Sequence, residues 1–280
     1  MKAQKYQQDL LSKLDMEEVT KIHEFEEDAI WQMNNGQDVE VSYAIMENVD
    51  GVNLMQFFNN AIESGMKLNE RDCRFLFYRI AQALHKFHIS GLAHRDIKPE
   101  NIILTPDYKI RFVDFDCVSP LSGRDGCSQF LRTRIGTQTY MAPEILKGIP
   151  YRGTDVDIFS FGVMLITLCP MRYPFDSASR DDPKYAELMS NNPNRFWMYY
   201  AEDLGITNEL KDLCQLLLKE DPAIRGSMTE LMCHPWMWGE KITQEEFAEK
   251  YDKIMESTKV RAKAESLDVD CALKPAERLK

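Results

Sequence analysis

The sequence has 280 residues, of which 44% are hydrophobic and 28% charged, enough to bury the core of one large domain or of two small lobes. The formal net charge of −11 argues against nucleic acid or an anionic membrane as the main partner. The seven cysteines include no Cys-x-x-Cys pair, which argues against a zinc site or a disulfide framework and favours a reducing compartment.

Targeting segments are not evident. The opening MKAQKYQQDLLSK has no continuous apolar stretch, unlike a secretory signal. The longest apolar run, Ile158–Cys169, is shorter than the ~20 residues of a membrane-spanning helix. We therefore predict a protein without a membrane span, located in the cytoplasm, with the nucleus as the alternative.

The first elements in chain order are a helix and a hairpin. Three leucines between positions 10 and 14 share one side of a predicted helix. The segments Val19–Phe25 and Val39–Met46 are rich in β-branched residues and predict two strands. Asn34-Asn35-Gly36 between them predicts a turn, so the two strands are expected to form a hairpin.

A long helix and two short strands follow. Asn69 is a typical N-cap, and Gly91 is typical of a residue that follows a helix. The residues between them have helical spacing of their apolar side chains, namely Phe77, Ile80, Ala81, Leu84 and Phe87. Beyond Gly91, the segments NIIL and KIRFV predict two strands around the turn TPDY.

Helices are predicted from Thr154 onward. Near the end, Thr243 and Glu246 have the spacing of a capping box. The helix that follows carries an apolar stripe of Phe247, Tyr251 and Ile254, which we expect to pack on the main body of the protein.

The segment His94–Asn101, HRDIKPEN, lies between the long helix and a short strand. It resembles the catalytic loop of eukaryotic protein kinases. The resemblance implies that Asp96 accepts the proton of a substrate hydroxyl, that Lys98 reaches the transferring phosphate, and that Asn101 holds a metal ion. Lysine at position 98 is typical of Ser/Thr kinases rather than tyrosine kinases.

The segment Val113–Asp116, VDFD, follows the second short strand. It resembles the Asp-Phe-Gly motif of kinases, whose aspartate binds the Mg²⁺ of ATP, a role that falls to Asp114. Asp116 replaces the glycine of that motif. It either steadies a cation or is a solvated turn residue, and the sequence does not decide between the two.

The segment Gly136–Glu144, GTQTYMAPE, resembles the end of the kinase activation segment. By this resemblance Thr137 bonds near the catalytic aspartate and Glu144 pairs with a buried arginine, which corresponds to Arg225. Asp157 corresponds to the aspartate that supports the backbone of the catalytic loop. The roles of Glu144, Arg225 and Asp157 are structural, whereas Thr137 belongs with Arg95 and Thr133 to the regulatory residues.

Thr133 lies at a position where many kinases are phosphorylated. A phosphate there would carry nearly two negative charges and would pair with Arg95. An ordinary loop threonine is an equally good interpretation. His234-Pro235-Trp236 resembles the His-Pro-Trp that closes the catalytic domain of calcium/calmodulin-dependent-type kinases.

The segment Tyr43–Gly51 resembles the hinge between the two kinase lobes. The resemblance makes Met46 the gatekeeper and implies that the backbone of Glu47 and Val49 binds adenine. Asn53 is expected to reach the ribose, and Ile103 belongs to the same nucleotide-binding set. The implied cofactors are ATP and Mg²⁺, and the implied substrate is a protein Ser or Thr hydroxyl.

The resemblance is incomplete before the hinge. Gln7 aligns with the glutamate of the family's helix C, and neither a Gly-x-Gly-x-x-Gly loop nor its partner lysine precedes it. We predict an α+β, kinase-like two-lobe fold, with a mostly helical C-lobe and an N-lobe reduced to helix C and the fourth and fifth strands of the family. The expected divisions are residues 1–50 (N-lobe and hinge), 51–240 (C-lobe) and 241–280 (charged helix and tail).

Three functional hypotheses remain open. The chain is an incomplete version of an active Ser/Thr kinase, which we favour because its catalytic motifs are intact. Alternatively, it is a catalytically impaired pseudokinase that acts as a binding scaffold. In the third hypothesis a partner chain completes the N-lobe.

Overall fold

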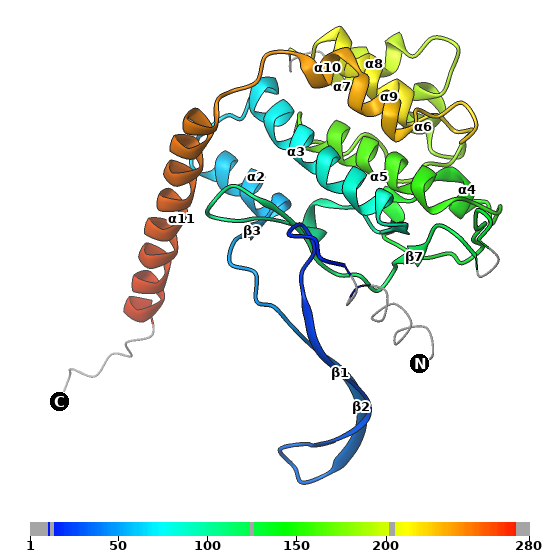
Figure 1. Ribbon diagram of the computed structural model, residues 1–280. Coiled ribbons are helices and arrows are strands. Elements are labelled where there is room, and N and C mark those ends of the chain that lie inside the picture. The colour runs from blue at the N-terminus through cyan, green and yellow to red at the C-terminus, as the bar shows by residue number, and fades with distance from the viewer. Residues whose placement is uncertain (1–10, 12–13, 124–125, 202–204, 273–280) are drawn as a thin grey trace.

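The computed structural model describes residues 11, 14–123, 126–201 and 205–272. A body of helices carries several short strands on one face, and a two-stranded hairpin projects from that face (Figure 1). This is the predicted kinase-like α+β fold. None of the described helices has the length and hydrophobicity needed to cross a membrane.

The hairpin consists of β1 (Ile22–Gln32) and β2 (Asp38–Met46), which pair antiparallel from Ile22↔Met46 to Gln32↔Asp38. The predicted hairpin and its turn are therefore confirmed, with Gly36 at φ +81° in the turn. The predicted bounds of the first strand were wrong. Val19 and Thr20 instead join the body, because Val19 bridges Phe112 and the Thr20 amide donates to the Phe112 carbonyl at 3.2 Å.

Short strands lie where the hairpin meets the body. A three-stranded sheet has the order β3–β5–β6, formed by Val52–Asn53, Ile102–Leu104 and Ile110–Phe112. A second pair joins β4 (Leu92–Ala93) to β7 (Ser119–Pro120). The two strands predicted around the TPDY turn are thus confirmed as β5 and β6.

Helices form the rest of the body. The principal ones are α2 (Leu54–Glu63), α3 (Glu70–Ile89), α5 (Gly153–Leu168), α8 (Asn208–Leu217) and α11 (Gln244–Ala272). Shorter helices are α4 (Pro143–Leu146), α6 (Pro183–Leu188), α7 (Asn194–Ala201), α9 (Met228–Cys233) and α10 (Pro235–Trp238), with 3₁₀ turns η1 (Pro99–Asn101) and η2 (Gln138–Tyr140). Asn69 caps α3 as predicted, by accepting hydrogen bonds from the amides of Arg71 and Asp72.

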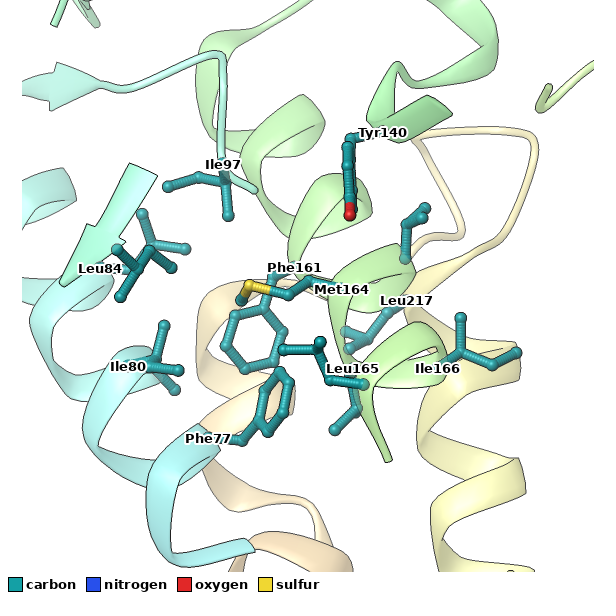
Figure 2. Packing of buried hydrophobic residues seen from close by; sticks show 14 of the residues in the cluster. Phe77, Ile80, Leu84, Ile97, Tyr140, Phe161, Met164, Leu165, Ile166 and Leu217 are labelled. Carbon is teal, nitrogen blue, oxygen red and sulfur yellow. The ribbon is translucent and has the colours of Figure 1, made fainter. Parts of the chain in front are cut away.

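The core forms where α3 packs on α5. Phe77 of α3 meets Phe161 of α5 edge to face, with ring centroids 5.5 Å apart, and Ile80 and Leu84 extend the contact (Figure 2). Each such side chain contributes about 1.5–3 kcal/mol on burial. Nearly all residues of α5 are buried, so this helix belongs to the core that supports the catalytic loop.

Helix α11 runs along the outside of α2 (Figure 1). The predicted capping box is present, since the Thr243 amide donates to Glu246 at 2.8 Å and the Glu246 amide donates to Thr243 Oγ1 at 3.1 Å. The predicted stripe is buried, and Phe247 stacks on Phe75 of α3 with a centroid separation of 4.7 Å. The first half of α11 is therefore part of the packed body.

Candidate active site

Asp157 of α5 holds the catalytic loop. It is fully buried and accepts hydrogen bonds from the His94 amide at 2.8 Å and the Arg95 amide at 2.6 Å. His88 of α3 adds a contact of 2.9 Å through Nε2. Arg95 has a positive φ of 64°, which costs free energy for a residue with a Cβ. The bonds to Asp157 hold the loop in this conformation.

Asp96 stands at the centre of the site. One carboxylate oxygen accepts the Thr137 amide at 2.8 Å. The other accepts Lys98 Nζ at 2.6 Å and Asn101 Nδ2 at 3.0 Å. Lys98 Nζ also donates to Thr137 Oγ1 at 2.9 Å. Four residues singled out in the sequence therefore meet around one carboxylate.

The charges of Asp96 and Lys98 reinforce each other. Burial acts to raise the pKa of Asp96, but hydrogen bonds from Lys98 and Thr137 outweigh it and lower that pKa. Burial acts to lower the pKa of Lys98, and the neighbouring charges of Asp96 and Asp114 raise it. At neutral pH both groups are ionised, so an anionic acceptor lies beside a cation that suits a phosphate.

Asp114 lies beside this pair. The Val113 amide donates to the Asn101 carbonyl at 3.0 Å, which brings Asp114 next to the catalytic loop. Asp114 is exposed, and its charge acts on Lys98. The structure thus places Asp114 beside the loop that carries Asp96 and Asn101, and the joint role of the three residues at a metal-bound nucleotide stays a prediction.

Asp114 and Asn101 suit a magnesium ion. Both side-chain hydrogen bonds that Asn101 makes to described residues use Nδ2, which leaves its amide oxygen for a cation. Mg²⁺ commonly takes one or two protein oxygen ligands and keeps several waters. Asp116 is exposed. Burial raises the pKa of the neighbouring Cys117 thiol to about 11, and the negative charges of Asp96, Asp114 and Asp116 act in the same direction.

The predicted hinge follows β2. Met46 is half-exposed, and the Glu47 amide donates to the Lys21 carbonyl at 2.8 Å. The Glu47 carboxylate pairs with Arg111 of β6 at 2.5 Å, which lowers the pKa of Glu47 and ties the hinge to the body. The backbone of Val49 makes no hydrogen bond to any described residue, so its amide and carbonyl are available to a ligand.

Gly51 lets the hinge approach β5. Its φ is +148°, and a Cβ there would lie 2.5 Å from the Leu104 carbonyl oxygen and 2.8 Å from a side-chain carbon of Ile103. Only glycine fits this approach. Asn53 pairs with Ile103 across β3 and β5, so these two predicted nucleotide-binding residues are neighbours.

Asn53 also has a role that the sequence reasoning missed. Its side-chain oxygen accepts the Gln56 amide at 2.9 Å and caps α2. The position of an asparagine directly before the apolar run LMQFF was the available signal. Any contact between Asn53 and a ribose would therefore use its amide nitrogen.

Arg95 and Thr133 are joined through a residue that was not predicted. Arg95 donates to the Cys117 carbonyl at 2.5 Å and to the Tyr151 hydroxyl at 3.2 Å. The Tyr151 hydroxyl donates in turn to the Thr133 carbonyl at 2.7 Å. Thr133 itself is exposed. Nothing in the sequence near Tyr151 indicates this bridge, because its partners lie far away along the chain.

Glu144 and Arg225 form a buried pair. The two guanidinium nitrogens donate to the two carboxylate oxygens at 2.7 and 2.8 Å, and the side chains are 4% and 1% exposed. Arg225 also donates to the carbonyls of Lys219, Asp155 and Glu220. Gln7, which aligned with the family's glutamate in helix C, lies outside the described residues.

The fold and this arrangement define a phosphotransferase-like protein. A family model described as "Protein kinase domain" matches residues 2–237. The chain therefore belongs to the protein kinase family.

Curated relatives of the chain are named as kinases, one of them as a serine/threonine-protein kinase. The chain is 36% identical over 198 residues to the SNF1-related protein kinase catalytic subunit alpha KIN12 of Arabidopsis thaliana, covering 69% of this chain and 36% of that protein. It is 35% identical over 204 residues to the serine/threonine-protein kinase cds1 of Schizosaccharomyces pombe, covering 70% and 41%. It is 32% identical over 195 residues to Sperm motility kinase 2B of Mus musculus, covering 70% and 37%. The matches thus span little more than a third of these relatives.

Proposed function

We propose that this chain transfers the γ-phosphate of Mg·ATP to Ser or Thr hydroxyls of a protein substrate. The observation that carries the proposal is the Asp96 carboxylate, which Lys98, Asn101 and Thr137 hold in one orientation. Phosphoryl transfer depends mainly on positioning and on neutralisation of charge, and this arrangement supplies both.

Each residue has one task in this reaction. Asp96 orients the substrate hydroxyl and accepts its proton, while Lys98 faces the transferring phosphate. Asp114 and the amide oxygen of Asn101 hold Mg²⁺, which when bound neutralises phosphate charge. The backbone of Glu47 and Val49 would bind adenine, Asn53 would reach the ribose, and Ile103 would belong to the same nucleotide-binding set.

The hairpin supports a further part of the proposal. Within the described residues β1 and β2 pair only with each other, and Ile30, Trp31 and Ile45 are 75%, 65% and 47% exposed. An isolated hairpin is marginal in water, and open apolar edges favour added strands. We infer that further strands, from the same protein or from a partner chain, complete this lobe.

The exposed hairpin also favours the alternative of a binding scaffold. A scaffold would capture a partner through the apolar side chains of β1 and β2 without transferring phosphate. The departure at Asp116, where the family has glycine, is the sequence feature in the site that agrees with this alternative.

The test is a Mg·ATP-dependent transfer assay on Ser- and Thr-containing peptides. Asp96→Asn is expected to abolish transfer, and Asp252→Asn, at an exposed position on α11, serves as the matched control that retains it. Absence of transfer by the folded chain together with the strands that complete its lobe, or unchanged transfer by Asp96→Asn, would reject the kinase proposal. Retained capture of a protein partner by inactive Asp96→Asn would then support the scaffold.

A further inference from the structure

A groove lies on the side of α3 that faces away from α5. Its cavity has a volume of about 470 Å³. The walls come from α3, from the β5–β6 turn, from the segment before β1 and from the connection between α10 and α11. Tyr78 of α3 is half-buried at its wall, and the buried side chains of Phe75 and Ile242 form its apolar floor.

The groove gathers positive charge in a protein whose net charge is −11. Four cations line it: Arg79 and Lys86 of α3, Lys109 of the β5–β6 turn, and Lys241 of the α10–α11 connection. They come from three separate segments of the sequence, which the fold brings together.

Two of these cations already bind carboxylates of the chain itself. Lys86 pairs with Glu18, and Lys109 pairs with Glu17 at 2.6 Å. Both glutamates precede Val19, whose bridge to Phe112 anchors this segment beside the groove. The chain thus places a short acidic segment on one half of the groove.

The other two cations have no such partner among the described residues. Arg79 donates there to two neutral oxygens, the Tyr108 carbonyl at 3.1 Å and Gln244 Oε1 at 2.8 Å, and it stacks over Phe75 at 4.5 Å. Lys241 lies over the Tyr78 ring at 4.4 Å. Neither forms an ion pair with a carboxylate of the described residues.

The environment of both cations is unfavourable for their charge. Both are half-buried, and burial lowers the pKa of Arg79 and of Lys241, with the charge of Arg74 adding to the effect on Lys241. Paired with a carboxylate, each would regain a favourable interaction.

We propose that this groove docks an acidic linear segment of a partner protein. Carboxylates of the segment pair with Arg79 and Lys241, and an apolar side chain between them packs on Tyr78. The segment would thus occupy the half of the groove that Glu17 and Glu18 leave open, and would pair with its cations in the same way. The proposal stands independently of phosphoryl transfer.

The experiment measures the fluorescence anisotropy of a short labelled peptide that alternates glutamate with isoleucine and phenylalanine. The full chain is expected to bind it, more weakly as salt rises. Lys241→Gln is expected to weaken binding about tenfold, the effect of losing ~1.4 kcal/mol. Lys253→Gln, at an exposed position on α11, is the matched control and leaves binding unchanged. Glu18→Gln frees Lys86 and tightens binding.

Three outcomes would overturn the proposal. One is equal affinity for the counterpart peptide in which glutamine replaces every glutamate. The second is unchanged affinity in both Lys241→Gln and Arg79→Gln, with native folding verified by circular dichroism. The third is displacement of the peptide by a single-stranded oligonucleotide at physiological salt, which would indicate a site for nucleic acid.

Discussion

Replacing Glu144 with glutamine breaks the buried pair at the end of the activation segment. The substitution nearly preserves shape but removes the negative charge opposite Arg225, whose side chain is 1% exposed. An amide also presents an N–H group to one guanidinium nitrogen, so one of the two hydrogen bonds, at 2.7 and 2.8 Å, is lost. Breaking a buried pair by removing one partner costs about 3–5 kcal/mol.

Urea unfolding followed by circular dichroism measures this cost. For a domain of this size the loss corresponds to a decrease in Tm of roughly 6–20 °C. Lys147→Gln is the control, because the Lys147–Glu220 pair at 2.5 Å is 46% and 23% exposed. Exposed pairs contribute only about 0–1 kcal/mol.

The reasoning predicts a clear order of stability. Lys147→Gln should unfold close to the parent protein, and Glu144→Gln should unfold well before it. If the free energy of unfolding of Glu144→Gln fell by less than about 1 kcal/mol, other groups would have to stabilise the buried charge of Arg225. The argument from desolvation would then be wrong.

Three further predictions follow from single sites. Gly51→Ala should destabilise the protein by about 1–3 kcal/mol, because φ is +148° and the new Cβ would meet the Leu104 carbonyl; urea unfolding measures this, and an unchanged midpoint would contradict it. Because the pKa of Asp96 is lowered in the folded state, its ionised form stabilises the fold above about pH 4, and this contribution is lost as pH falls through the folded-state pKa. In that range the stability of Asp96→Asn should therefore depend less on pH than the stability of the parent protein. Parallel curves of stability against pH for the two proteins would refute the prediction. Phe247→Ala should cost about 3–5 kcal/mol and speed amide hydrogen exchange in α11, and exchange that stays slow would show that the aromatic contact with Phe75 does not hold the helix.

Features set by neighbouring residues could be predicted from the sequence. The cap at Asn69, the capping box of Thr243 and Glu246, and the hairpin turn at Gly36 depend on residues a few positions apart. The catalytic loop was predictable because His94–Asn101 is a contiguous motif. The order of motifs along the chain also predicted that the segment of Asp114 lies beside this loop, and the Val113 amide bonds the Asn101 carbonyl there.

Long-range contacts could not be predicted in the same way. Val19 continues the pattern of the first strand, yet it pairs with Phe112, which lies far along the chain. The hydrogen bonds of Tyr151 to Arg95 and Thr133 likewise leave no local pattern. Such contacts are selected by packing, which overrides local strand propensity.

Helix α3 connects the two proposed sites. Phe77 fixes its inner face to α5, Arg79 lies in the groove on its outer face, and the helix ends at Ile89, shortly before His94 of the catalytic loop. Along the helix axis, Arg79 and Ile89 are ~15 Å apart. A substrate docked through an acidic segment would be held near Asp96 at a raised effective concentration, provided that its linker spans this distance. Substrates whose linker between the acidic segment and the Ser or Thr is too short should therefore be phosphorylated no faster than substrates without the segment. This dependence on linker length distinguishes a docking groove that serves phosphorylation from an acidic-peptide site unrelated to it.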